Sequence, residues 1–135
     1  MNKIEHIAIA VKSLDESIPL YEKLLGTPCY KKEEVESEQV NTAFFKTGEN
    51  KIELLESSSK DGVINRFIEK KGEGMHHIAF AVDDIQKEIL RLKAAGFEFI
   101  NDEPERGADN KLICFLHPKT TNGVLIELCQ DAPLI

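Results

Sequence analysis

Apolar residues recur in this chain with two periods that alternate along its length. Residues 4–11 ("IEHIAIAV") and 75–82 ("MHHIAFAV") are rich in isoleucine, valine and phenylalanine, which is typical of strands of about six to eight residues. Residues 13–26 follow with apolar residues at helical spacing. These are Leu14, Ile18, Tyr21 and Leu25. The pattern predicts a strand and then an amphipathic helix that starts at a Ser13–Glu16 capping box and stops at Gly26.

The rest of the chain continues in the same manner. A second amphipathic helix, ending at Gly96, is predicted from the stripe Ile85, Ile89 and Leu92. A linker at residues 59–72 contains a short helix at about residues 63–70. The remaining strands are expected at residues 29–35, 39–47 and 51–57, and then at 97–102, 111–118 and 123–130.

The two halves of the chain repeat one order of elements. His6 aligns with His77, 71 residues later, and Glu53 aligns with Glu127, 74 residues later. Each half therefore reads as a βαβββ module, one at about residues 1–58 and the other at about 73–135. One module alone buries too little apolar surface to be stable, so we expect both modules to form one domain.

Two histidines and two glutamates recur at equivalent places in the modules. Strand alternation puts His6 and His77 on faces that otherwise carry alanines, and each glutamate is flanked by apolar residues. A lone histidine on a strand is more often structural, and a lone glutamate is usually solvated. A carboxylate in an apolar strand is costly if it is buried without a partner, and a cation is a suitable one. The set His6, Glu53, His77 and Glu127 is therefore a candidate four-ligand metal site.

Composition narrows the class of protein. The chain has 135 residues, 41% of them hydrophobic, and a net charge of −7, which suits one globular domain and argues against a nucleic-acid surface. No apolar run approaches the roughly 20 residues that span a bilayer. Cys29, Cys114 and Cys129 are interpreted as small buried residues in a reducing compartment. We expect a cytoplasmic protein whose partners are small molecules or a second copy in a homodimer.

The segments "HIAIAV", "TGENKIELLES", "GEGMHHIAFAVDDI" and "FLHPKTTNGVLIEL" resemble the vicinal oxygen chelate superfamily, which includes glyoxalases and bleomycin-resistance proteins. More narrowly, they look like methylmalonyl-CoA epimerases over about residues 3–130. The expected fold is α+β, with two tandem βαβββ modules forming an eight-stranded, partly open barrel-like sheet around a metal site. The resemblance also implies that His6, Glu53, His77 and Glu127 are the metal ligands.

A donor set of two histidines and two glutamates suits a divalent cobalt, nickel, manganese, iron or zinc ion. Such an ion keeps two open positions, which the thioester oxygen and the carboxylate of methylmalonyl-CoA can occupy while the C2 proton leaves to give an enolate. We expect Glu127 to act as one base, with Glu53 or a bound water as the second. The alternative is that both glutamates stay as static metal ligands. In the resembling epimerases a further glutamate follows an "EQGV" segment, and the aligned residue here is Thr42, which is no base.

The CoA phosphates would need cations, since no glycine-rich phosphate loop is visible. Candidates beside the "HPK" motif are Arg106, Lys111, His117 and Lys119. Two other functions use the same fold: a glyoxalase I acting on a glutathione hemithioacetal, and a metal-free module that sequesters a ligand. The repeat alignment selects His77 as the ligand of the "HH" pair, and His76, which aligns with Glu5, should point to the opposite face.

Overall fold

The computed structural model describes residues 1–133, which form eight strands and three α-helices. The strands are β1 (Lys3–Ala10), β2 (Lys31–Val35), β3 (Val40–Thr47), β4 (Asn50–Ser57), β5 (Gly74–Ala81), β6 (Glu105–Gly107), β7 (Lys111–Leu116) and β8 (Ile126–Asp131). The α-helices are α1 (Leu14–Leu25), α2 (Val63–Lys71) and α3 (Ile85–Ala94). Short 3-10 turns lie at η1 (Glu36–Glu38), η2 (Ala108–Asn110) and η3 (Pro118–Thr120).

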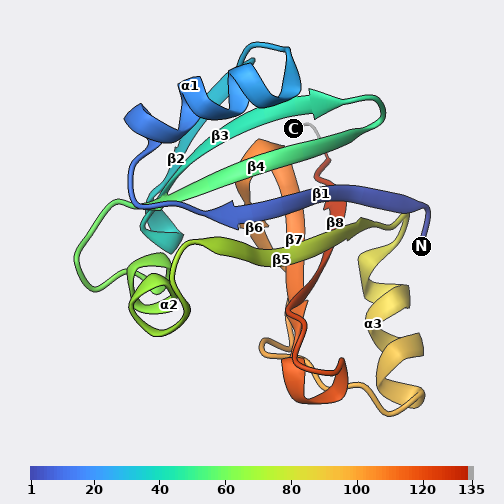
Figure 1. Cartoon of the computed structure of the whole chain (residues 1–135). Helices are drawn as coiled ribbons and strands as arrows, with labels where there is room; N and C mark the ends of the chain where they lie inside the picture. The colour runs from blue at the N-terminus through green and yellow to red at the C-terminus, as the bar shows by residue number, and fades with distance from the viewer. Residues whose placement is uncertain (134–135) are drawn as a thin grey trace. The chain divides into compact units, whose positions relative to one another are not determined.

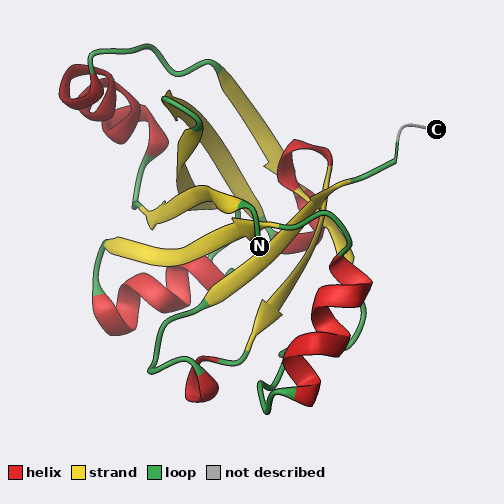
Figure 2. Ribbon diagram, turned by 90° about the vertical axis from the view of Figure 1, so that its right-hand side faces the viewer, coloured by secondary structure: helices red, strands yellow, loops and turns green. Residues whose placement is uncertain are grey.

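Each half has the predicted βαβββ order (Figure 1). In the first half β1 pairs with β4 in parallel, while β2, β3 and β4 pair antiparallel. In the second half β5 pairs with β8 in parallel, while β6, β7 and β8 pair antiparallel. The strand order of the sheet is β2-β3-β4-β1-β5-β8-β7-β6. Strands, yellow in Figure 2, and helices, red, give the predicted α+β class, which is confirmed.

The chain is divided into two compact units. One unit is His6–His76, and the other joins Met1–Glu5 to the chain from His77 onward. The linker helix α2 thus belongs to the first unit, with Ile64 buried. The expectation that both modules form one domain stays a prediction. Within residues 1–133, no helix is long and apolar enough to cross a membrane.

Helix α1 begins and ends where its sequence indicates. The Oγ of Ser13 accepts a hydrogen bond from the backbone N–H of Glu16 at 3.3 Å, and Gly26 closes the helix at φ 68°, a conformation that favours glycine. The predicted apolar face packs on β3 and β4, where Phe45 and Leu54 are fully buried. The first unit therefore has its core between α1 and the sheet.

Helix α3 packs on its own unit in the same way. Asp84 caps its start by accepting from the N–H of Lys87 at 3.1 Å. The predicted stripe of Ile85, Ile89 and Leu92 is buried against β7 and β8. The helical period that predicted this stripe is confirmed.

A strand side chain also binds the first turn of each helix. Glu56 of β4 accepts from the N–H of Leu14 at 2.8 Å, and Gln130 of β8 accepts from the N–H of Ile85 at 2.7 Å. Glu56 and Gln130 each follow a candidate ligand glutamate by three residues, so they face the helix while that glutamate faces the other side. Each helix start is thereby fixed to the strand that carries the glutamate.

The strand predicted at residues 97–102 is wrong. Phe99 makes an isolated bridge to Leu116, and the regular partner of β7 is β6, three residues from Glu105 to Gly107. Phe97 and Phe99 pack against the α3 core, which explains their apolar alternation without a ladder. Pro104, which has no N–H to donate, lies between the bridge and β6.

Cys114 gives a prediction about stability. Cys114 is fully buried in the α3 core, and burial, with the nearby Glu127 charge, raises the pKa of its thiol from 9.0 to about 12. Between these values the folded state keeps a proton that the unfolded state releases, so the free energy of unfolding falls as pH rises. From pH 8 to pH 10 this contributes a fall of about 1 kcal/mol.

Urea denaturation at both pH values, on wild type and Cys114→Ala, measures this fall. We expect Cys114→Ala to lose that part of the decrease, whereas Cys29→Ala, at a half-buried thiol, retains it. Equal pH dependence in wild type and Cys114→Ala would contradict the prediction.

Candidate metal centre

The first half places one histidine against one glutamate. His6 lies on β1 and Glu53 on β4, and the parallel register puts Ala8 opposite Glu53. The Nε2 of His6 is 3.1 Å from the Oε2 of Glu53, and each side chain is 7% exposed. The alternation of β1 that points His6 and Ala8 to one face therefore brings the histidine to the carboxylate.

The second half repeats this pair. His77 lies on β5, Glu127 lies on β8, and Ala79 is opposite Glu127 in the parallel register. The Nε2 of His77 is 3.0 Å from the Oε1 of Glu127, and each side chain is 6% exposed. Both histidines thus stand two residues before the alanine that faces the glutamate. The repeat in the sequence corresponds to a repeat in the geometry.

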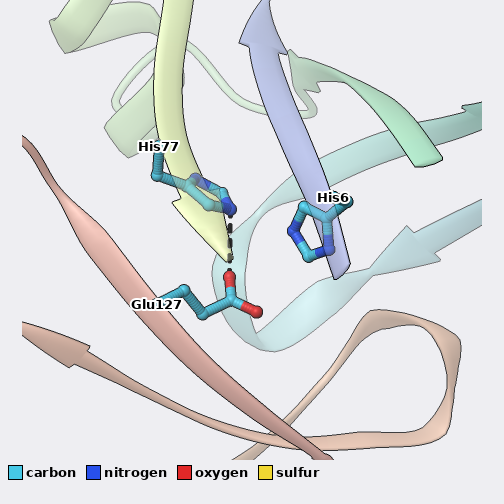
Figure 3. A group of neighbouring side chains, drawn as sticks. All are labelled: His6, His77 and Glu127. Atoms are coloured by element: carbon cyan, nitrogen blue, oxygen red, sulfur yellow. Dashed lines mark ion pairs between the residues drawn. The ribbon is translucent and has the colours of Figure 1, made fainter. Parts of the chain in front are cut away.

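The second pair is seen directly in the arrangement of its side chains. Figure 3 shows the imidazole of His77 pointing toward the carboxylate of Glu127, with a dashed line that marks their ion pair. Glu53 makes the corresponding contact with His6 in the first half. Each half therefore has a histidine–glutamate pair of its own.

The distances fit the coordination of a divalent ion. Two donors about 2.1 Å from an ion lie roughly 3.0 Å apart when they are at right angles and about 4.2 Å apart when they are opposite. The two histidine–glutamate separations match the first value. Nitrogen and carboxylate donors without a thiolate suit a borderline divalent metal. The residues present therefore fit a metal centre.

Aromatic rings stand beside the glutamates, a feature that strand alternation alone did not predict. Phe44 is directly opposite Glu53 in the register, and Phe115 is directly opposite Glu127. The ring of Phe115 meets His77 edge-on, with centroids 5.3 Å apart. Phe44 and Phe115 are 71 residues apart, as the two histidines are. The alignment of the two halves could therefore have identified them as an equivalent pair. These rings exclude water from one side of the carboxylates.

Two other residues that the sequence set apart have contacts of their own. His76 meets the ring of Phe67 on α2 edge-on, with centroids 4.9 Å apart. Thr42 is 1% exposed, and its hydroxyl donates to the backbone carbonyl of Glu33 at 2.9 Å. Thr42 therefore has a structural hydrogen bond, consistent with its having no role as a base.

The four cations predicted to hold CoA phosphates separate into two pairs. Arg106 and Lys111 lie at the start of β7, whereas His117 and Lys119 follow its other end. Arg106 donates to the side chain of Asn110 at 3.0 Å. Lys111 pairs with Asp131, and Lys119 pairs with Glu98 at 3.0 Å. The Nδ1 of His117 accepts from the N–H of Lys119 at 3.2 Å. Their role in binding CoA stays a prediction.

With this geometry in view, the chain can be assigned to a family. Residues 5–115 match the Glyoxalase/Bleomycin resistance protein/Dioxygenase superfamily, and the chain belongs to it. Within that superfamily the chain groups with methylmalonyl-CoA epimerases. It is 36% identical to the ethylmalonyl-CoA/methylmalonyl-CoA epimerase of Cereibacter sphaeroides, over 96% of this chain and 98% of that protein. It is 35% identical to the mitochondrial methylmalonyl-CoA epimerase of Homo sapiens, over 96% of this chain and 74% of that protein.

Solved structures agree with this grouping. A variant of Streptomyces coelicolor methylmalonyl-CoA epimerase in complex with 2-nitronate-propionyl-CoA is 34% identical, with a TM-score of 0.93 over 99% of this chain and 97% of that one. A methylmalonyl-CoA epimerase in complex with methylmalonyl-CoA and NH4+ is 33% identical, with a TM-score of 0.92 over 98% and 99% of the two chains. The predicted resemblance and the predicted class, an isomerase of the acyl-CoA epimerase type, are confirmed.

The two adjacent histidines offer a direct test of the metal centre. We expect His77→Ala to lose most of its bound divalent metal, because it removes a buried ligand 3.0 Å from Glu127. His76→Ala is the matched control and should keep its metal, because its side chain packs against Phe67. Cobalt or zinc content after dialysis, measured by elemental analysis, reads out both variants. Equal metal content in the two variants would contradict the assignment.

Proposed function

We propose that this protein epimerises methylmalonyl-CoA at C2, with one divalent metal bound by His6, Glu53, His77 and Glu127. The observation that carries the proposal is the repeated buried histidine–glutamate pair, with separations of 3.1 and 3.0 Å that suit adjacent ligands. The relatives that bear the name methylmalonyl-CoA epimerase support the substrate.

A divalent cobalt, nickel, manganese, iron or zinc ion would supply Lewis-acid chemistry here, stabilising the negative charge that develops on the thioester oxygen. The four side chains would hold it, and each is at most 7% exposed. Charge interactions are stronger in such a buried site than in water, which is why its burial matters for catalysis.

The protein's own task is to move a proton across C2. Epimerisation removes the C2 proton from one face, giving an enolate, and returns a proton to the opposite face. We assign the removal to the carboxylate of Glu127, which becomes a carboxylic acid, and the delivery to Glu53 in its protonated form, which becomes a carboxylate. The pairing of each glutamate with its own histidine supports this assignment, because the imidazole Nε2 lies within 3.1 Å and fixes the carboxylate on the alanine-lined face. A bound water is the alternative to Glu53.

One further activity has support from the comparisons. The probable lactoylglutathione lyase of Vibrio cholerae is 31% identical to this chain, over 96% of this chain and 91% of that protein. A glyoxalase would use the same ligands on a glutathione hemithioacetal. The higher identity to the epimerases favours methylmalonyl-CoA. A homodimer and a place in the cytoplasm stay predictions.

Solvent exchange distinguishes these activities. In D2O we expect the metal-loaded protein to incorporate deuterium at C2 of methylmalonyl-CoA, and a chelator should abolish the incorporation, because the charge on the thioester oxygen would then be unstabilised. Proton NMR of the C2 position measures the exchange. Absence of exchange with the metal-loaded protein, combined with loss of the hemithioacetal from methylglyoxal and glutathione, would replace the epimerase with a glyoxalase. A protein that carries no metal and performs neither reaction would be a ligand-binding module.

Glutamine variants test the two bases. We expect Glu127→Gln to slow C2 exchange by about 10²- to 10⁴-fold, the usual contribution of a positioned base, while the amide oxygen can still bind metal. Glu53→Gln should retain exchange of one epimer but slow conversion to the other, if its carboxylate delivers the second proton. Single-turnover measurements starting from each epimer report this asymmetry. Unchanged interconversion in Glu53→Gln would assign the second transfer to water.

A further inference from the structure

Two lysines and a tyrosine gather on the outer strands of the first unit. The Nζ of Lys46 lies 5.0 Å from the ring centroid of Tyr30, and the Nζ of Lys31 lies 5.7 Å from that of Phe44. The rings of Tyr30 and Phe44 are in contact, with centroids 6.2 Å apart and an angle of 42°. Tyr30 is 40% exposed, so this group, called the lysine–tyrosine patch below, reaches solvent.

The register places the patch on the same face as the candidate ligands of this half. Lys31 is opposite Phe44, and Phe44 is opposite Glu53, so the three form a row across β2, β3 and β4. Residues directly opposite in a sheet point to the same face. Neighbouring strands are about 4.8 Å apart, so the backbone of Lys31 is roughly 10 Å from that of Glu53. The other face of these strands is covered by α1.

Two of the contacts that these lysines make are weak enough to be exchanged for a ligand. The Nζ of Lys31 is 3.3 Å from Glu33, with side chains 38% and 30% exposed. Exposed ion pairs of this kind contribute about 0–1 kcal/mol, and an exposed cation–π contact such as that of Lys46 contributes about 0.5–1 kcal/mol. A phosphate group carries more charge than one carboxylate and offers stronger hydrogen bonds.

Of the cations suggested beside the "HPK" motif, Lys111 lies on the face of Glu127 but is paired with Asp131, and Arg106 lies on the other face. Arg106 is opposite Leu112, which is opposite Gln130, the side chain that binds the first turn of α3. Arg106 therefore lies on the face that carries α3, away from the face of Glu127. The lysine–tyrosine patch has two cations beside each other on a ligand-bearing face.

We propose that Lys31 and Lys46 bind the phosphate groups of the acyl-CoA. This inference rests on the proposed function for the identity of the substrate. A thioester held at Glu53 extends its pantetheine arm away from the metal centre, and the row of residues leads from Glu53 to Lys31 in one direction. Tyr30 holds Lys46 toward this row. The patch sets the affinity for CoA and takes no part in proton transfer.

The test compares neighbouring lysines on opposite faces. Lys31→Gln combined with Lys46→Gln is the test variant, and Lys32→Gln is the control, because Lys32 is exposed and points to the other face of β2. Calorimetric binding of CoA itself should weaken about tenfold in the double variant, the loss expected for one or two charge-assisted phosphate contacts, and stay unchanged in the control. The KM for methylmalonyl-CoA should rise by a similar factor with kcat unchanged. The KM for methylmalonyl-pantetheine, which lacks the nucleotide phosphates, should not change.

The outcomes separate the patch from the proposed function. Weaker CoA binding in the double variant, with no epimerisation by the wild type, would retain the patch and reject the epimerase. Normal epimerisation with CoA binding unaffected in the double variant would reject the patch and retain the epimerase. The patch is also rejected if Lys32→Gln weakens binding equally, if methylmalonyl-pantetheine is affected equally, or if the wild type does not bind CoA.

Discussion

The burial of two carboxylates is the constraint on which the site depends. Glu53 and Glu127 are 5% and 4% exposed, and each lies between two apolar residues of its strand. An ionised carboxylate removed from water is strongly unfavourable unless it is paired. Each is met by a histidine of similar burial from the parallel neighbouring strand. Each histidine therefore offsets part of the cost of burying its carboxylate.

The surrounding elements hold these pairs in register. Parallel pairing of β1 with β4 and of β5 with β8 places each histidine two residues before the alanine opposite its glutamate. On the other side of the sheet, Glu56 and Gln130 bind the first turns of α1 and α3. The helices therefore contribute to the site indirectly, by fixing the strands that carry the ligands. Moving a strand by one residue would turn its glutamate toward a helix.

In the proposed function, substrate recognition and chemistry would use different parts of the same face. The acyl-CoA epimerase class follows from the family to which the chain belongs and from the metal-like geometry of the pairs. The nucleotide end of such a substrate requires cations at a distance from the reacting carbon. The lysine–tyrosine patch meets this requirement in a chain whose net charge is −7, because it concentrates positive charge beside one strand edge.

The sequence by itself determined the repeat, and with it most of the fold and the ligand candidates. A period of two fixes which strand residues share a face, and the recurrence of His6 at His77 and of Glu53 at Glu127 fixed which polar residues to compare. The strand predicted at residues 97–102 was wrong because alternation reports burial, and Phe97 and Phe99 are half-buried against the α3 core without forming a strand ladder. Only the tertiary structure decided which strands are neighbours. Pairing between strands far apart in the chain depends on register, and that register alone places Lys31, Phe44 and Glu53 in one row.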